Sequence, residues 1–435
     1  MHRLLPFLPP RRPRVIVPVE HRDNFRRLYH DIAWFGILNG TILSFLSIFA
    51  ARTGASNQQI GILGAAPAIA NLLFSLPASV FLQKIPTAKG VAWSSIAQRI
   101  FYLMLALLPM FVTSQPLIWA IIVGTFVMSI PGTGLAVGIN ALIAQTVPIE
   151  WRAHVVGTRN ALLSLFTIVA LFISGQILTV LPYPLNYQVV FFLGFLGGML
   201  SSINLFLIKP RTAPALQSST HAQPPEAAGE RKNHVSAEVR RKIRQANTSQ
   251  PLTLKTLKGK FGLILFMLFM FNFALYLSVP LFPLYQVNIL KLSDRVISLG
   301  SSFFQITTLI VSTQIGFLAR KYSNHKLTGI GLSSLVVYPL LLPLSKTALI
   351  FMLVSAMGGI AWAMVNGALV NYLLEQIPSN DLAGHFAWYN LAMNAAILLG
   401  SLSGPLIATQ IGLTAALIIF GLGRLLSGLA LLRWG

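Results

Sequence analysis

The chain has 435 residues, of which 55% are hydrophobic and only 10% are charged. Soluble proteins carry about 25% charged residues, so this composition excludes an ordinary water-soluble fold and predicts an all-α membrane protein with several spans. The formal net charge of +22 could indicate a nucleic-acid partner, but the basic residues are confined to particular loops, which excludes that class. The chain contains no cysteine, so disulfides, thiol catalysis and zinc–thiolate sites are excluded as well.

Hydrophobic segments that could cross a bilayer occur throughout the chain. A span requires about 20 mostly apolar residues, and twelve segments meet this requirement, six in each half. We expect the two longest, 116–147 and 261–289, to tilt or to extend beyond the hydrocarbon. The predicted spans are 30–50, 58–80, 91–112, 116–147, 156–180 and 187–208, and then 261–289, 296–319, 327–344, 347–374, 385–408 and 412–433.

A polar, basic segment separates the two sets of spans. Residues 209–260 are rich in Pro, Ala, Ser, Gln and basic side chains, and they cannot bury enough apolar surface to fold alone. The predicted organisation is therefore a basic N-terminal arm (1–29), a six-helix bundle (30–208), a basic linker (209–260) and a second six-helix bundle (261–435).

The basic residues also predict the orientation. If the N-terminus lies in the cytoplasm, 28 Lys and Arg residues fall on the cytoplasmic side and four fall outside, as the positive-inside rule requires. We therefore expect a multi-pass protein of the cytoplasmic (inner) membrane, with both termini and the linker in the cytoplasm. The expected partners are the lipid bilayer, anionic lipid headgroups at the basic loops and a small-molecule substrate, and the chain is expected to be a monomer.

The two halves resemble each other at corresponding places. An offset of 236 residues aligns Leu63-Gly64 in span 2 with Leu299-Gly300 in span 8. Such matches indicate an internal duplication, and parallel six-helix repeats are the plan of one large class of transporters. Around the loops after spans 4 and 10, an offset of 230 aligns Pro148 with Pro378, Ala153 with Ala383 and Asn160 with Asn390.

With this plan, the sequence resembles the major facilitator superfamily across the twelve predicted spans. In that family the cytoplasmic loops after spans 2 and 8 usually carry a Gly, then an acidic residue, then basic residues. Here the loop after span 8 reads GFLARKYSNHK. Gly316 and Lys321 fit the pattern, and Arg320 stands where the acid is expected.

A second motif supports the same resemblance. Pro148, Arg152 and Gly157 are similar to residues at the family's start of span 5, and Pro378 is the counterpart of Pro148 in the second half. The resemblance implies two pseudo-symmetric six-helix bundles with a substrate path between them, lined by spans 1, 4, 7 and 10.

Polar and aromatic side chains in these four spans are the candidates for substrate contacts. Polar residues inside hydrocarbon are costly and usually face the bundle interior. Amide and aromatic side chains together suit a neutral polar or an amphipathic ligand, although amides in membrane helices often only bridge two helices. The candidates are Asn39 in span 1, Asn140 in span 4, Asn272 and Tyr276 in span 7, and Trp362 and Asn366 in span 10.

Charged residues near the spans are few. Asp31 and Glu375 are the nearest candidates for a coupling site, and the alternative for Asp31 is an interfacial helix charge. Arg99 and Arg424 are expected to reach the membrane surface, with the alternative that Arg99 pairs with Asp31 as an inner gate. No Arg or Lys falls in the middle of spans 1, 4, 7 or 10, which argues against an organic anion as substrate.

These features predict secondary active transport. A small or amphipathic solute would cross by alternating access, with export favoured over uptake because the path has few charges and several aromatic residues. The alternative is a non-transporting membrane receptor or assembly protein of the same fold, which the imperfect loop motifs would fit. No enzyme, cofactor or metal is expected, because the chain has no Gly-rich phosphate loop and its eight histidines lack metal-ligand spacing.

Overall fold

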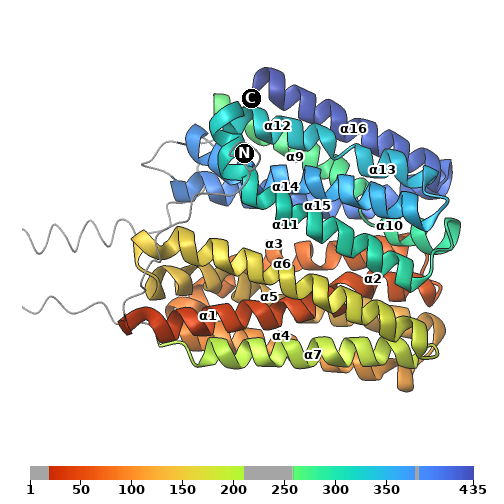
Figure 1. Ribbon diagram of the computed structural model, residues 1–435, viewed down its shortest axis with the longest axis horizontal. Coiled ribbons are helices and arrows are strands. Elements are labelled where there is room, and N and C mark those ends of the chain that lie inside the picture. The colour runs from red at the N-terminus through yellow and green to blue at the C-terminus, as the bar shows by residue number, and fades with distance from the viewer. Residues whose placement is uncertain (1–18, 210–256, 258, 378–381) are drawn as a thin grey trace, which may run out of the picture.

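The computed structural model describes residues 19–209, 257, 259–377 and 382–435 (Figure 1). Within these residues every regular element is helical, and twelve helices are long and apolar enough to cross a membrane. This finding confirms the twelve predicted spans. Residues 1–18 of the N-terminal arm, nearly all of the basic linker, and Pro378 lie outside the described residues.

The six crossing helices of the first half run up to the linker. The first of them begins at Val19, inside the predicted N-terminal arm, and it contains a π-helical turn at Asn39–Leu43. The elements are α1 (Val19–Leu38), α2 (Ser44–Arg52), α3 (Asn57–Gln83), α4 (Thr87–Leu107), α5 (Ser114–Thr146), α6 (Ile149–Val180) and α7 (Leu185–Phe206).

The six crossing helices of the second half include two that are interrupted. A π-helical turn at Tyr285–Ile289 completes the first of these. The elements are α9 (Lys260–Ser278), α10 (Leu281–Leu284), α11 (Asp294–Tyr322), α12 (Asn324–Ser334), α13 (Val337–Leu341), α14 (Ala348–Gln376), α15 (Leu382–Ile411) and α16 (Leu413–Trp434). We call the end of the molecule that carries Lys209 and Lys260 the linker end, and the end that carries Arg52 and Asp294 the far end.

Some prolines interrupt a crossing helix and others do not; α15, for example, continues through Pro405. In α3 and α5 the helix continues through Pro67, Pro77 and Pro131. The predicted span 261–289, in contrast, is interrupted next to Pro280, and the ninth span is interrupted between α12 and α13, just before Pro339. Because proline has no N–H, the carbonyl four residues earlier loses its helical partner, and neighbouring helices must satisfy it within a membrane.

The same pairs of helices pack in the two halves. In the first half α1 packs on α6 and α7, α4 packs on α5 and α7, and α3 packs on α5. In the second half α9 packs on α15 and α16, α12 packs on α14 and α16, and α11 packs on α14. The halves meet where α3 packs on α15 and where α6 packs on α11. These are equivalent pairs, so the fold consists of two pseudo-symmetric six-helix bundles (Figure 1).

Two contacts on the seam between the halves repeat this symmetry at the level of residues. Ser298 Oγ of α11 donates a hydrogen bond to the carbonyl of Leu171 in α6 at 2.5 Å. At the equivalent place, a Cβ on Gly61 of α3 would lie 2.5 Å from the carbonyl oxygen of Ser401 in α15. The helices therefore approach each other very closely on both sides of the two-fold axis.

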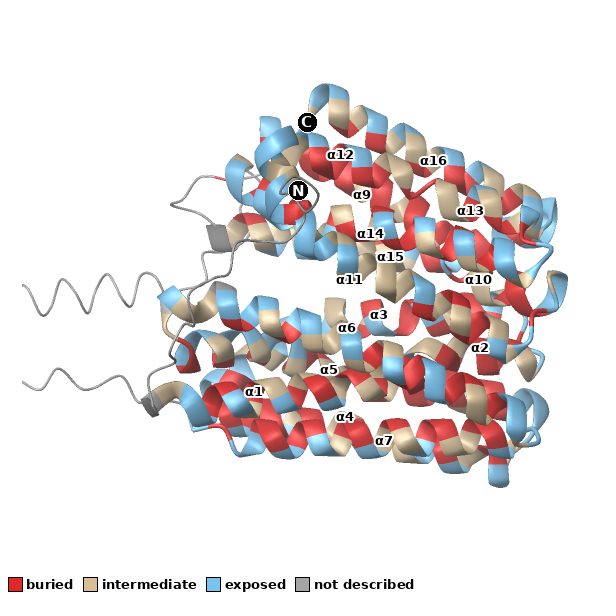
Figure 2. Ribbon diagram, in the orientation of Figure 1, coloured by how far each residue is buried: buried red, intermediate tan, exposed pale blue. Residues whose placement is uncertain are grey.

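Many large apolar residues of the helices are exposed, and exposed positions recur along the outer helices of both bundles (Figure 2). Trp93 of α4 and Leu426 of α16, for example, are 61% and 67% exposed. Soluble monomers rarely expose extended apolar surface, and in a bilayer such faces contact lipid.

Gly404→Ala is expected to lower the melting temperature of the protein. A Cβ at this position of α15 would lie 2.1 Å from the carbonyl oxygen of Leu277 in α9, so the two helices would have to separate. Overpacking of this kind costs about 1–3 kcal/mol. Gly316→Ala in α11 is the matched control, because nothing lies within 4 Å of its Cβ. Thermal unfolding in detergent measures both variants, and equal melting temperatures would contradict the packing.

Candidate functional site

A cavity of about 520 Å³ lies on the seam between the halves, with most of its lining from the second half. Its volume falls in the range of roughly 300–1,000 Å³ that is typical of small-molecule sites. Among the residues that the structure describes, Arg424 is the only charged residue in the lining. The other polar and aromatic lining residues are Ser44, Ser47, Tyr276, Phe282, Gln286, Ser301, Phe304, Gln305, Tyr338, Ser355, Trp362 and Ser401.

Two of the six predicted substrate-binding residues lie in this cavity. Tyr276 of α9 and Trp362 of α14 present aromatic surface to it. Asn140 of α5 and Asn366 of α14 are exposed and do not line it. The structure therefore brings the two aromatic candidates together, and the role of the amides in substrate binding stays a prediction.

The other two predicted amides are engaged within their own halves. Asn39, in the π-helical turn that follows α1, donates from Nδ2 to Thr167 Oγ1 of α6 at 3.2 Å. Asn272 donates from Nδ2 to the carbonyl of Leu268, one turn earlier in α9, at 2.8 Å. Neither residue lines the cavity, and the bond of Asn39 is the helix-bridging alternative that the sequence left open.

Gln286 is a buried cavity residue that sequence reasoning did not single out. It lies in the π-helical turn Tyr285–Ile289, and its Nε2 donates to the hydroxyl of Tyr338 at 3.1 Å. The sequence signal for this feature was the Pro280 and Pro283 pair just before it, which interrupts the regular helix.

Arg424 is held inside the second bundle. Its side chain is 1% exposed, so the expectation that it reaches the membrane surface is wrong. Its Nη1 donates to the carbonyl of Leu335 at 3.3 Å, and its Nη2 donates to the carbonyl of Leu275 at 2.8 Å and to Ser278 Oγ. Leu335 lies four residues before Pro339, so Arg424 satisfies a carbonyl that the proline leaves without a helical partner.

Arg99 is equally buried in the first bundle, so the expectation that it reaches the surface is also wrong. Its Nη1 donates to Gln98 Oε1 at 2.5 Å, and its guanidinium carbon lies 5.4 Å from the ring centroid of Phe35 and 5.8 Å from that of Tyr102. These distances are those of cation–π contacts. Arg99 thus packs against aromatic rings of its own half.

Asp31 pairs with Arg159 of α6 rather than with Arg99. The Asp31 Oδ2 to Arg159 Nη1 distance is 3.0 Å, and Ser201 Oγ of α7 donates to Asp31 Oδ1 at 2.7 Å. Both members of the ion pair are buried, so Asp31 is paired inside the first bundle, and its coupling or gate role stays a prediction. Sequence reasoning missed Arg159, although a buried carboxylate in a membrane helix requires such a partner.

Glu375, the third predicted coupling or gate residue, lies at the linker end. It is exposed, and its Oε1 accepts a hydrogen bond from Asn324 Nδ2 at 2.6 Å. This contact joins the last turn of α14 to the start of α12 within the second bundle. A coupling role for Glu375 therefore stays a prediction.

The predicted loop motifs act on helix ends where the structure describes them. Pro148 directly precedes α6, and Arg152 donates to the carbonyls of Val147 and Ala144 at 3.2 and 2.8 Å, which caps the end of α5. Arg320 and Lys321 are exposed in the last turn of α11, where positive charge favours the helix dipole. Nothing lies within 4 Å of a Cβ built on Gly157 or on Gly316.

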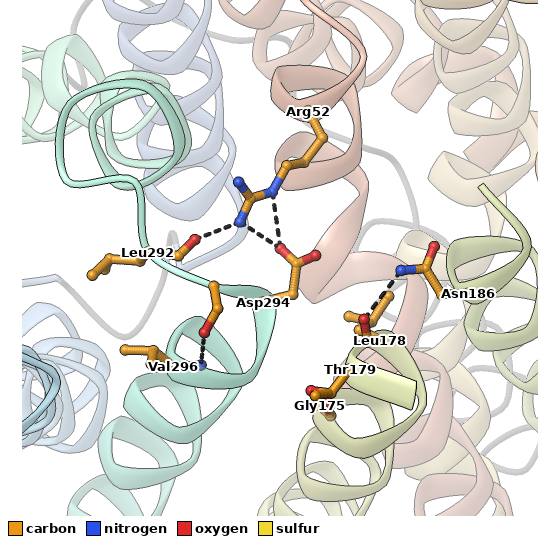
Figure 3. Close-up of polar contacts among 9 residues, drawn as sticks. Arg52, Gly175, Leu178, Thr179, Asn186, Leu292, Asp294 and Val296 are labelled. Atoms are coloured by element: carbon orange, nitrogen blue, oxygen red, sulfur yellow. Dashed lines mark hydrogen bonds and ion pairs between the residues drawn. The ribbon is translucent and has the colours of Figure 1, made fainter. Parts of the chain in front are cut away.

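An ion pair joins the two halves at the far end. Arg52, the last residue of α2, contacts Asp294, the first residue of α11 (Figure 3). Arg52 Nη2 and Nε lie 2.9 and 3.1 Å from Asp294 Oδ1, and Nη2 also donates to the carbonyl of Leu292. Both charges also complement the dipoles of their helices.

Further hydrogen bonds across the seam lie at the far end or near the middle of the helices. Asn57 Nδ2 donates to Thr409 Oγ1 at 3.4 Å, and Asn71 Nδ2 donates to Asn394 Oδ1 at 3.3 Å. From there the two bundles diverge toward the linker end (Figure 1). The far end is therefore the closed end of this conformation.

Twelve crossing helices in two equivalent bundles, with a cavity on their seam, define the class of membrane carriers built from parallel repeats. The family model described as Major Facilitator Superfamily matches residues 32–295 and 264–435. The chain therefore belongs to the major facilitator superfamily, whose members bind small molecules within the membrane and are not enzymes in general. Comparison with curated protein sequences gives no match.

Solved structures share this fold at low sequence identity. A D-xylose–proton symporter aligns with a TM-score of 0.68 and 15% identity over 95% of this chain and 97% of its own. The inward-open xylose transporter XylE from E. coli aligns with a TM-score of 0.68 and 14% identity over 94% and 95%. A mutant of the nucleoside transporter NupG aligns with a TM-score of 0.64 and 13% identity over 94% and 99%.

Proposed function

We propose that this protein is a secondary active transporter that moves a small or amphipathic solute across the membrane by alternating access. The observation that carries the proposal is the cavity on the seam, together with the interactions that close the far end above it. Two bundles that are held together at one end can rock about such a cavity and expose it to one side at a time.

The cavity lining supports a solute with both polar and apolar surface. Hydroxyl and amide groups such as Ser301 and Gln286 can form hydrogen bonds, while Tyr276 and Trp362 offer ring faces. Xylose and nucleosides, the substrates named for the structural neighbours, are the first solutes to test. Export over uptake stays the expectation from the sequence, and flux in oriented proteoliposomes measures the direction.

A cysteine placed in the cavity tests alternating access without a known substrate. The chain has no cysteine of its own, so Ser301→Cys would be the single thiol. In oriented vesicles, we expect this thiol to react with a membrane-impermeant reagent added on either side. Bridging Arg52→Cys and Asp294→Cys with a bifunctional thiol reagent should remove reactivity from the far side only. Reaction from one side alone, before any bridging, would contradict the proposal.

Cysteine labelling is also expected to place the linker end in the cytoplasm. Thr87→Cys lies at the start of α4, and Ser323→Cys lies between α11 and α12. Both should react only with reagent added on the cytoplasmic side. Thr53→Cys, at the far end, should react only from outside. The physical reason is the excess of Lys and Arg on the linker side. Labelling of positions 87 and 323 from opposite sides would exclude the two-fold topology.

A further inference from the structure

We propose that Arg424 binds the anionic group of the transported solute, and that this solute is an amphipathic monocarboxylate. The inference rests on the proposed function, because it assigns a substrate class to the same cavity. It also reverses the expectation against an organic anion, which considered only the helices expected to line the path. Arg424 belongs to α16, the last crossing helix, and it nevertheless lines the cavity.

The charge of Arg424 has no counter-ion among the described residues. The three ion pairs found there join Arg27 with Asp23, Arg52 with Asp294, and Arg159 with Asp31. Arg424 is buried, and no acidic side chain contributes to the described lining of the cavity. A buried charge without an opposite charge is costly. A negatively charged ligand in the cavity would supply the missing partner.

The guanidinium also retains hydrogen-bonding capacity. An arginine has five N–H groups and cannot accept a hydrogen bond. Arg424 uses one N–H of Nη1 and both of Nη2 in its contacts with Leu335, Leu275 and Ser278. Its Nε is buried and has no hydrogen-bond partner. A carboxylate oxygen would accept a charge-assisted bond from one of the two remaining N–H groups.

The rest of the lining favours one negative charge and an apolar body. Since Arg424 is the only charged residue in the described lining, it could neutralise only one of the two negative charges of a dianion. The rings of Phe282, Tyr276 and Trp362 lie in the same cavity, and the Arg424 guanidinium carbon is 5.5 Å from the ring centroid of Phe282. The carboxylate would therefore lie at Arg424, and the apolar part of the solute would contact the aromatic rings.

A structural role of Arg424 has to be separated from binding. Arg424 satisfies the Leu335 carbonyl that Pro339 leaves free, so Arg424→Met alone would also weaken folding. Pro339→Ala restores an N–H at position 339. The next residue, Leu340, already donates its N–H to the carbonyl of Val336 at 3.1 Å. The backbone here is therefore helical enough for an N–H at position 339 to donate to the carbonyl of Leu335. The double variant Pro339→Ala with Arg424→Met therefore removes the positive charge of Arg424 while the carbonyl of Leu335 keeps a hydrogen-bond donor.

Binding to the purified full-length protein tests the proposal. The probes are benzoate, 2-naphthoate and octanoate, each compared with its primary amide. We expect at least one acid to raise the melting temperature, as a ligand specific for the folded state must, and its amide to have no such effect. Calorimetry should show that this acid binds about tenfold or more weakly to Pro339→Ala with Arg424→Met than to Pro339→Ala alone. Arg99→Met is the control, because it removes a buried arginine that does not line this cavity.

Each outcome decides for or against the anion site. Equal binding of an acid and its amide, equal binding to both Pro339→Ala backgrounds, or no binding of any acid would overturn it. An equal loss of binding in Arg99→Met would also overturn it, because the effect would then be one of folding. Binding of an acid that depends on Arg424, without flux in proteoliposomes, would leave the anion site standing and remove the transport proposal. Flux of a neutral solute that Arg424→Met leaves unchanged would remove the anion site and leave the transport proposal standing.

Discussion

Asp31→Ala is expected to lower the free energy of unfolding by about 3–5 kcal/mol, because it leaves the buried charge of Arg159 without its partner. The two side chains lie 3.0 Å apart and are both buried. Ser201 donates a second hydrogen bond to the Asp31 carboxylate, and Arg159 also donates to the carbonyl of Leu28 at 2.8 Å. The pair therefore ties α1 to α6 and α7, and thermal or chemical unfolding in detergent measures its loss.

Removal of both charges is expected to be less harmful than removal of one. Arg159→Met alone should resemble Asp31→Ala, whereas the double variant leaves no buried charge unpaired and should recover part of the stability. Asp23→Ala is the matched control, because its contact with Arg27 is 4.0 Å long and largely exposed, so its loss should cost less than about 1 kcal/mol. Strictly additive effects of the two buried substitutions would show that Asp31 and Arg159 act independently.

Arg52→Gln is expected to increase the reactivity of Ser301→Cys toward reagent on the far side by about tenfold. The substitution removes the charge that holds Asp294 across the seam, so the conformation with an open far end becomes more populated. A tenfold shift corresponds to about 1.4 kcal/mol. This value lies just below the range for hydrogen bonds to charged groups, about 1.5–3 kcal/mol, as suits a pair that is partly exposed. Thiol-labelling rates in oriented vesicles measure the change.

Two variants show whether the effect comes from this ion pair. Arg52→Asp with Asp294→Arg exchanges the charges and should bring the labelling rate back toward that of the unaltered pair. Arg295→Ala removes an exposed positive charge directly next to Asp294 and should leave the rate unchanged. If Arg295→Ala increased labelling as much as Arg52→Gln does, the effect would reflect surface charge in general, and the gate assignment would be incorrect.

The sequence by itself determined the number of crossing helices, the duplication and the family. Each of these depends on features that can be read along the chain. A helix satisfies nearly all of its backbone polar groups internally, as the bilayer core requires, so each crossing has to appear as a long apolar segment. The duplication similarly leaves matching residues at a constant offset, as with Leu63-Gly64 and Leu299-Gly300.

Only the tertiary structure decided which side chains meet. Asp31 pairs with Arg159 and not with Arg99, Arg52 pairs with Asp294 in the other half, and Arg424 lines the cavity from a helix that was expected to lie outside the path. The physical reason is that lipid is as apolar as a bundle core, so both faces of a crossing helix are apolar and the sequence period does not reveal which face points inward. The rotation of each helix follows instead from close contacts between helices and from the interruptions near Pro280 and Pro339.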